Sequence, residues 1–123
     1  MPITALSALV VDDVAAVRSY ITEILQQLGI NSVLEAADGT SATRLFEQHQ
    51  PQLVFLDIQL PDISGQQLLI QFKQKQQHTT VFMVSAFSSV ENLQQAVENG
   101  AKAFVMKPFT AQRINSLVRP LLH

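Results

Sequence analysis

The decisive stretch near the start of the chain reads Leu6-Ser7-Ala8-Leu9-Val10-Val11-Asp12-Asp13, an apolar run that ends directly in two acids. Short apolar runs are typical of strands that are buried on both faces of a parallel sheet. Three more such runs occupy residues 53–56, 81–84 and 103–106. A weaker, mixed run at residues 32–36 suits a strand at the edge of the same sheet.

Between these runs, apolar side chains recur at the spacing of amphipathic helices, and we expect the resulting stripes to pack in the core. The five stripes consist of Val14, Val17, Ile21, Ile24, Leu25 and Leu28; Ala42, Leu45 and Phe46; Leu68, Leu69 and Phe72; Val90, Leu93 and Val97; and Ile114, Leu117, Val118 and Leu121. Asp38 and Thr110 suit helix starts, whereas Gly29 and Gly100 suit helix ends. The pattern predicts one helix after each strand.

Alternating strands and helices in a chain of 123 residues predict an α/β protein. Because crossovers between parallel strands are right-handed, helices on both faces give a doubly wound (βα)5 fold with a five-stranded parallel sheet. We expect the flavodoxin-like strand order 2-1-3-4-5, in which the mixed second run lies at an edge. No linker, repeat or shift in composition interrupts the pattern, so we interpret residues 1–123 as a single domain.

The composition narrows the classes of function. Ten acidic and eight basic residues give a net charge of −2 without any basic run, which disfavours direct binding to nucleic acid. The chain has no Cys, which excludes disulfides and Cys-ligated metal sites. The apolar runs are too short to span a membrane, and the N-terminus lacks the pattern of a secretory signal. We therefore expect a cytoplasmic protein with no membrane partner.

Four of the five runs carry a charged or reactive residue at their carboxyl end, namely Asp12 with Asp13, Asp57, Ser85 and Lys107. Ligands of open α/β sheets bind outside these ends, where the strand order reverses. In that arrangement the three acids converge, and a divalent cation would offset their mutual repulsion. Oxygen ligands without nearby His or Cys favour Mg²⁺. The alternative is that Asp12 or Asp13 only caps the following helix.

The two remaining groups point to phosphoryl chemistry. Lys107 supplies a cation for a phosphate oxygen, and Ser85 supplies a hydroxyl donor. A metal, a lysine and a hydroxyl around one carboxylate are the groups that stabilise a phosphoryl group during transfer. Asp57 can itself be the nucleophile and form an aspartyl phosphate.

Five motifs occur in a characteristic order: Val10-Val11-Asp12-Asp13, Ala36-Ala37-Asp38-Gly39, residues 56–65 (Leu-Asp-Ile-Gln-Leu-Pro-Asp-Ile-Ser-Gly), Val84-Ser85-Ala86, and residues 100–109 (Gly-Ala-Lys-Ala-Phe-Val-Met-Lys-Pro-Phe). Through these motifs the sequence resembles the receiver domain of bacterial two-component response regulators, the CheY-like family. The resemblance extends over nearly the whole chain. Each motif is weak alone, but together and at these spacings they are specific.

The resemblance implies a role for each matched residue. Asp57 corresponds to the phosphoacceptor, which takes a phosphoryl group from a phosphohistidine on a sensor histidine kinase or a phosphotransfer protein. For Mg²⁺ the resemblance implies Asp57 itself, Asp13 as a direct ligand, Asp12 as a ligand through water, and the backbone carbonyl of Gln59. Lys107 would contact the phosphoryl group.

The resemblance also implies a switch. Ser85 would swing to hydrogen-bond the phosphoryl group while Phe104 moves inward, and the Lys107-Pro108 peptide bond would be cis. The output protein would bind the face formed by the fourth helix, the fifth strand and the fifth helix. The candidate readout residues are Val90, Gln94, Lys102, Phe104 and Phe109. We expect the bulky Phe87 to hinder the hydrolytic water and to lengthen the lifetime of the aspartyl phosphate.

These implications describe a signalling switch rather than an enzyme, acting as a stand-alone single-domain regulator and as a monomer or weak dimer. An alternative is a receiver excised from a larger response regulator or hybrid kinase. A haloacid-dehalogenase-like phosphatase would need a second Asp where this chain has Gln59. A flavodoxin-like cofactor module would need a phosphate-binding loop in place of Asp12-Asp13, whose negative charge repels phosphate.

Overall fold

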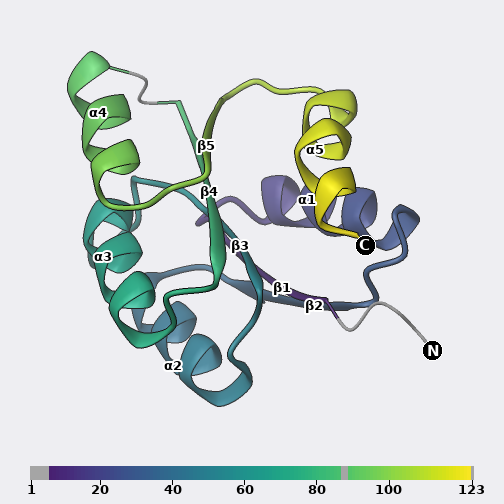
Figure 1. The fold of residues 1–123 in the computed structure, drawn as a ribbon, viewed down its shortest axis with the longest axis horizontal. Helices are drawn as coiled ribbons and strands as arrows, with labels where there is room; N and C mark the ends of the chain where they lie inside the picture. The colour runs from purple at the N-terminus through teal and green to yellow at the C-terminus, as the bar shows by residue number, and fades with distance from the viewer. Residues whose placement is uncertain (1–5, 87–88, 123) are drawn as a thin grey trace.

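The structure is a computed structural model, and it describes residues 6–86 and 89–122. Strands and helices alternate along these residues (Figure 1). The elements are β1 (Ser7–Val11), α1 (Ala15–Gln27), β2 (Ser32–Ala36), α2 (Gly39–His49), β3 (Leu53–Leu56), α3 (Gly65–Lys75), β4 (Thr80–Ser85), α4 (Val90–Glu98), β5 (Ala103–Met106), α5 (Ala111–Val118) and a short 3-10 turn (Arg119–Leu121). The prediction of one helix after each strand is confirmed.

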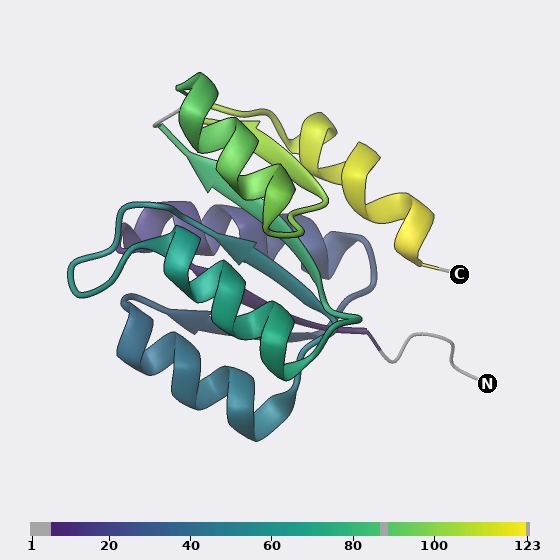
Figure 2. The same cartoon turned by 60° about the vertical axis from the view of Figure 1, so that its left-hand side comes forward.

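The strands form one parallel sheet in the order β2-β1-β3-β4-β5, as the sequence predicted. Helices α1 and α5 cover one face, and α2, α3 and α4 cover the other (Figures 1 and 2). Successive strand residues point to opposite faces, so each strand contributes to both cores. In β1, for example, Leu9 and Val11 pack toward α2 and α3, whereas Ala8 and Val10 pack toward α1 and α5.

The register brings the carboxyl ends of the central strands to one edge. Val11 of β1 pairs with Leu56 of β3, and Leu56 pairs in turn with Met83 of β4. All strands point the same way (Figure 2), so the residues that follow them meet at this edge.

The predicted capping residues act as expected. The side chain of Asp38 accepts a hydrogen bond from the backbone N–H of Ser41 at 2.8 Å, and Thr110 caps α5 in the same way. Gly29 and Gly100 have positive φ angles of 96° and 100°, which favour glycine directly after a helix end. None of the helices in the two described ranges has the length and hydropathy that a membrane crossing requires.

The expected burial of the helical stripes is wrong at three positions. Val14, Val90 and Val97 are 47%, 69% and 67% exposed, and the buried residue of α4 is instead Ala96. Helix α4 lies beside β5, an edge strand, so it has less sheet to cover than α3 has. Apolar spacing therefore identified α4 as a helix but did not identify its buried side.

Candidate functional site

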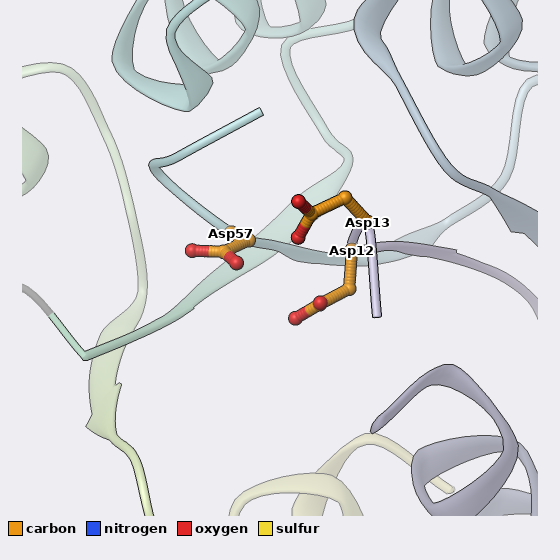
Figure 3. A group of neighbouring side chains, drawn as sticks. All are labelled: Asp12, Asp13 and Asp57. Atoms are coloured by element: carbon orange, nitrogen blue, oxygen red, sulfur yellow. The ribbon is translucent and has the colours of Figure 1, made fainter. Parts of the chain in front are cut away.

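Three carboxylates meet at the carboxyl edge of the sheet (Figure 3). Asp12 and Asp13 follow β1, and Asp57 follows the neighbouring β3. Asp12 and Asp57 are buried, Asp13 is exposed, and one oxygen from each carboxylate lies within 4.8 Å of the others. Such a cluster of negative charge requires compensation by a cation or by protonation.

Lys107, which follows β5, provides part of this compensation. Its Nζ donates to Asp12 Oδ2 at 2.6 Å and to Asp57 Oδ2 at 3.1 Å. The backbone N–H of Lys107 also donates to the carbonyl of Ser85 at 3.0 Å, which fixes the residue beside β4. The Lys107-Pro108 bond is cis, as predicted.

These contacts shift the pKa values of both partners. Burial lowers the pKa of Lys107, but its hydrogen bonds to Asp12 and Asp57 outweigh burial and raise the pKa above its usual value. Burial raises the pKa of Asp57; Lys107 opposes this rise, whereas the charge of Asp12 adds to it. Without further positive charge, the carboxyl of Asp57 is therefore harder to ionise than an ordinary aspartate.

The loop after β3 is closed on itself by short contacts. The N–H of Gly65 donates to the carbonyl of Ile58 at 2.7 Å, and the N–H of Gln59 donates to Asp57 Oδ1 at 3.2 Å. A Cβ atom on Gly65 would lie 2.0 Å from the carbonyl oxygen of Asp57, so only glycine permits this approach. The loop therefore holds the Asp57 side chain and the Gln59 peptide in one compact turn.

Asp62 ties the same loop to the start of α2. Its carboxylate accepts hydrogen bonds from the N–H groups of Gly39 and Thr40 at 2.7 and 3.0 Å. The hydrogen bond from Gly39 is the main reason that the pKa of Asp62 lies below its usual value. The sequence pattern alone assigns no role to Asp62, although this residue stands three residues before Gly65 in the motif of residues 56–65.

The donor set fits a magnesium ion. Every candidate ligand is an oxygen: the carboxylates of Asp12, Asp13 and Asp57 and the backbone carbonyl of Gln59. Asp12 is the most constrained, since its Oδ1 accepts from the N–H of Val14 at 2.9 Å and its Oδ2 from Lys107. Asp12 therefore closes a turn before α1 while it faces the site. Helix α1 itself has no side-chain cap at Val14, so the alternative that Asp12 or Asp13 caps this helix is wrong.

The predicted switch residues Ser85 and Phe104 lie on the neighbouring strands β4 and β5. Ser85 is the last residue of β4 and is fully buried. Phe104 in β5 is half-buried and packs against the core on the α2–α4 side of the sheet. Phe87 lies outside the described residues.

Phe109 is half-buried and contacts α1. Its ring stacks on Tyr20 of α1 with centroids 5.7 Å apart, and both rings line an apolar pocket beside Lys107. Val90, Gln94 and Lys102 are exposed, as a readout surface requires. Met106, which is 54% exposed on β5, adds to that surface and was missed because its run was interpreted as buried.

A doubly wound parallel sheet that gathers an acidic cluster and a lysine at the switch point of its strand order has its candidate binding site at that edge. The family model of the response regulator receiver domain matches residues 8–119. The chain therefore belongs to the response regulator receiver domain family. This assignment favours the receiver interpretation over the phosphatase and flavodoxin-like alternatives.

Relatives and solved structures agree with the assignment. The chain is 35% identical to the chemotaxis protein CheY of Bacillus subtilis over 115 residues, which are 94% of this chain and 96% of the relative. The CheY-like receiver domain of Methanospirillum hungatei has a TM-score of 0.91 and 28% identity, covering 97% of this chain and 94% of the other. In the CheX-CheY-BeF3-Mg²⁺ complex of Borrelia burgdorferi, the matching chain has a TM-score of 0.89 and 27% identity, with coverage of 96% and 90%.

Proposed function

We propose that the chain is a phosphorylatable switch that accepts a phosphoryl group on Asp57. The observation that supports this most directly is the meeting of Asp12, Asp13 and Asp57 with the ammonium group of Lys107. A carboxylate that is to attack phosphorus must be ionised and must face positive charge. When bound, Mg²⁺ would supply that charge and orient the phosphoryl oxygens.

The transfer is a single displacement. An oxygen of Asp57 attacks the phosphorus of a phosphohistidine on a sensor kinase or a phosphotransfer protein. The new O–P bond forms as the N–P bond breaks, and the bonding pair leaves with the imidazole nitrogen, which takes up a proton. Lys107 moves its hydrogen bond from the carboxylate to a phosphoryl oxygen, and Ser85 donates to another.

The proposed binding of an output protein rests on the charge that phosphorylation adds and on the apolar residues that α4 and β5 expose. Phosphorylation adds about −1.5 to −2 charges at the sheet edge, and the new bonds to Ser85 and Lys107 favour one arrangement of the last elements. Phe104 then packs further inward. The partner protein binds the face of α4, β5 and α5, where Val90 and Met106 expose apolar surface. We propose a single receiver domain that works as a monomer or weak dimer.

The test uses a small phosphodonor. The chain is incubated with acetyl phosphate and Mg²⁺, and intact mass spectrometry should find one added phosphoryl group. Asp57→Asn should abolish the adduct, whereas Glu91→Gln, which removes an exposed acid in α4, should leave it unchanged. An adduct that persists in Asp57→Asn, or no adduct in the unmodified chain, would refute the proposal.

A further inference from the structure

Arg18 of α1 lies between the acidic site and the edge strand β2. Its Nη1 donates to the backbone carbonyl of Asp12 at 2.6 Å, and its Nε donates to Glu35 Oε1 at 3.2 Å. The other oxygen of Glu35 accepts from the hydroxyl of Thr22 at 3.0 Å. The Arg18 side chain is only 17% exposed. A guanidinium group held on two sides and partly desolvated has little freedom to move.

The acceptor carbonyl belongs to the peptide that joins Asp12 to Asp13. Because a peptide unit is planar, the direction of this carbonyl also fixes the N–H and Cα of Asp13. The side chains of the two acids leave the chain in opposite directions before they turn toward Asp57 (Figure 3). The orientation of this one peptide therefore sets the direction in which the Asp13 side chain leaves the backbone.

Asp13 depends on this peptide more than its neighbour does. The Asp12 carboxylate is held by Val14 and Lys107, whereas no hydrogen bond to the Asp13 carboxylate occurs within residues 6–86 and 89–122. The backbone therefore sets the point from which the Asp13 carboxylate reaches the cluster, and only its two side-chain torsions remain to be fixed by a bound ion.

We propose that Arg18 is a positioning residue, which orients the Asp12–Asp13 peptide so that Asp13 can bind a divalent cation in the site. The inference rests on the proposed function, since it assigns to Arg18 a part in building the same site. Arg18 touches neither the cation nor Asp57 in this assignment. Glu35 of β2 accepts a hydrogen bond from the guanidinium group and is itself bonded by Thr22, so the position of Arg18 depends on the edge strand.

The geometry explains why lysine should not replace Arg18. The planar fork donates in two directions at once, to the Asp12 carbonyl and to Glu35, and it does so at a fixed angle. A lysine ammonium at position 18 keeps the charge but reaches only one acceptor in a fixed geometry. A positioning role therefore predicts that Arg18→Lys restores only part of what Arg18→Met loses.

The experiment measures Mg²⁺ binding directly, by calorimetry or by the shifts of backbone amide resonances during titration with MgCl2. Loss of a group that orients a metal ligand typically weakens binding about 10- to 100-fold, and we expect this range for Arg18→Met. Arg18→Lys should be intermediate. Arg44→Met, which removes an exposed arginine from α2, is the control for net charge and should bind as the unmodified chain does.

A second variant distinguishes a loss of Mg²⁺ binding from a general loss of folding. Glu35→Gln keeps Arg18 but weakens its anchor, and it should weaken Mg²⁺ binding severalfold while the free energy of unfolding without Mg²⁺ changes little. Equal affinity of Arg18→Met and the unmodified chain would overturn the inference, as would full restoration by Arg18→Lys. If Arg18→Met does not fold, unchanged affinity of Glu35→Gln would overturn it. Failure of the unmodified chain to bind Mg²⁺ would instead refute the proposed function.

Discussion

Helices α3 and α4 lie next to each other on one face of the sheet (Figure 2), but they are anchored to very different degrees. Helix α4 buries Ala96, while Val90 and Val97 at its two ends are largely exposed. Helix α3 instead buries a set of residues in its first two turns, namely Gly65, Gln66, Leu68, Leu69 and Phe72. Because burial of apolar area is the main stabilising contribution, α3 is fixed to the sheet and α4 can shift at low cost.

The two helices also differ in how they connect to the site. Helix α3 starts at Gly65, whose backbone is in direct contact with the Asp57 peptide. Helix α4 starts at Val90, four residues after Ala86 and five after Ser85, the end of β4. A change at Asp57 can therefore move the start of α3 only by disrupting the core. We expect the response to phosphorylation to appear in α4.

The largest difference should appear when one apolar side chain is shortened in each helix. Phe72 in α3 is fully buried and stacks on Phe46 with ring centroids 4.1 Å apart. Phe72→Ala should lower the free energy of unfolding by about 3–5 kcal/mol, measured by urea denaturation. Val97→Ala in α4 should change it by no more than about 0.5 kcal/mol. Similar losses in the two variants would show that α4 is anchored as firmly as α3.

The sequence predicted α3 and α4 with the same kind of evidence, and only one of the two stripes is buried. The apolar runs and the acids at their ends were sufficient for the strand order, because a parallel sheet brings those ends together. A helical stripe reports which residues share a face of the helix. It does not report how much sheet lies beneath that face, and this depends on the neighbouring strand.

The acidic cluster was predictable because each of its residues stands at a strand end. Arg18 and Gln66 were not predictable in the same way. Each is a polar residue at a helical position, where exposure to solvent is the usual expectation, and each is buried or partly buried by a contact distant in sequence. Arg18 bonds Glu35, 17 residues away, and Gln66 bonds Asn92, 26 residues away. Such contacts exist only after the elements have packed.

The first residues of the two helices offer the next comparison. Gly65→Ala places a Cβ 2.0 Å from the Asp57 carbonyl oxygen and 2.8 Å from the Ile58 Cα, and backbone atoms cannot rotate away. We expect a loss of about 1–3 kcal/mol in the free energy of unfolding, together with weaker Mg²⁺ binding, because Asp57 must move. Val90→Ala at the start of α4 should leave both quantities nearly unchanged. Unimpaired Gly65→Ala would show that the start of α3 is not fixed.

The carboxyl group of Asp57, which follows β3 and contacts the start of α3 through its peptide, should itself lower the stability of the metal-free fold. Since burial raises the pKa of Asp57, its ionised form destabilises the folded chain at pH 7, and Asp57→Asn should raise the free energy of unfolding. The gain should be smaller than the losses above. It should shrink as the pH falls through the raised pKa, because the unmodified chain then takes up a proton in the folded state. Glu91→Gln, which removes an exposed acid from the first turn of α4, is the control for net charge and should not raise the free energy of unfolding.

The smallest expected effect concerns the hydrogen bond that joins α3 to α4. Gln66 of α3 is 5% exposed, and its Nε2 donates to the backbone carbonyl of Asn92 in α4 at 3.0 Å. Within residues 6–86 and 89–122 its buried Oε1 has no hydrogen-bond partner, so the desolvation of this atom offsets part of the stabilisation that the hydrogen bond contributes.

Gln66→Leu should therefore change the global free energy of unfolding very little, because an apolar side chain of similar size fills the same space. It should nevertheless release α4, lowering the free energy of its local opening by about 1 kcal/mol, which corresponds to roughly 5-fold faster amide hydrogen exchange in α4. Gln67→Leu, at the exposed neighbouring position, is the matched control and should leave exchange in α4 unchanged. If amide hydrogens exchange faster in both α3 and α4 of Gln66→Leu, the hydrogen bond between Gln66 and Asn92 stabilises both helices. If only those of α4 do, this single amide is what holds a weakly packed helix against a firmly packed one.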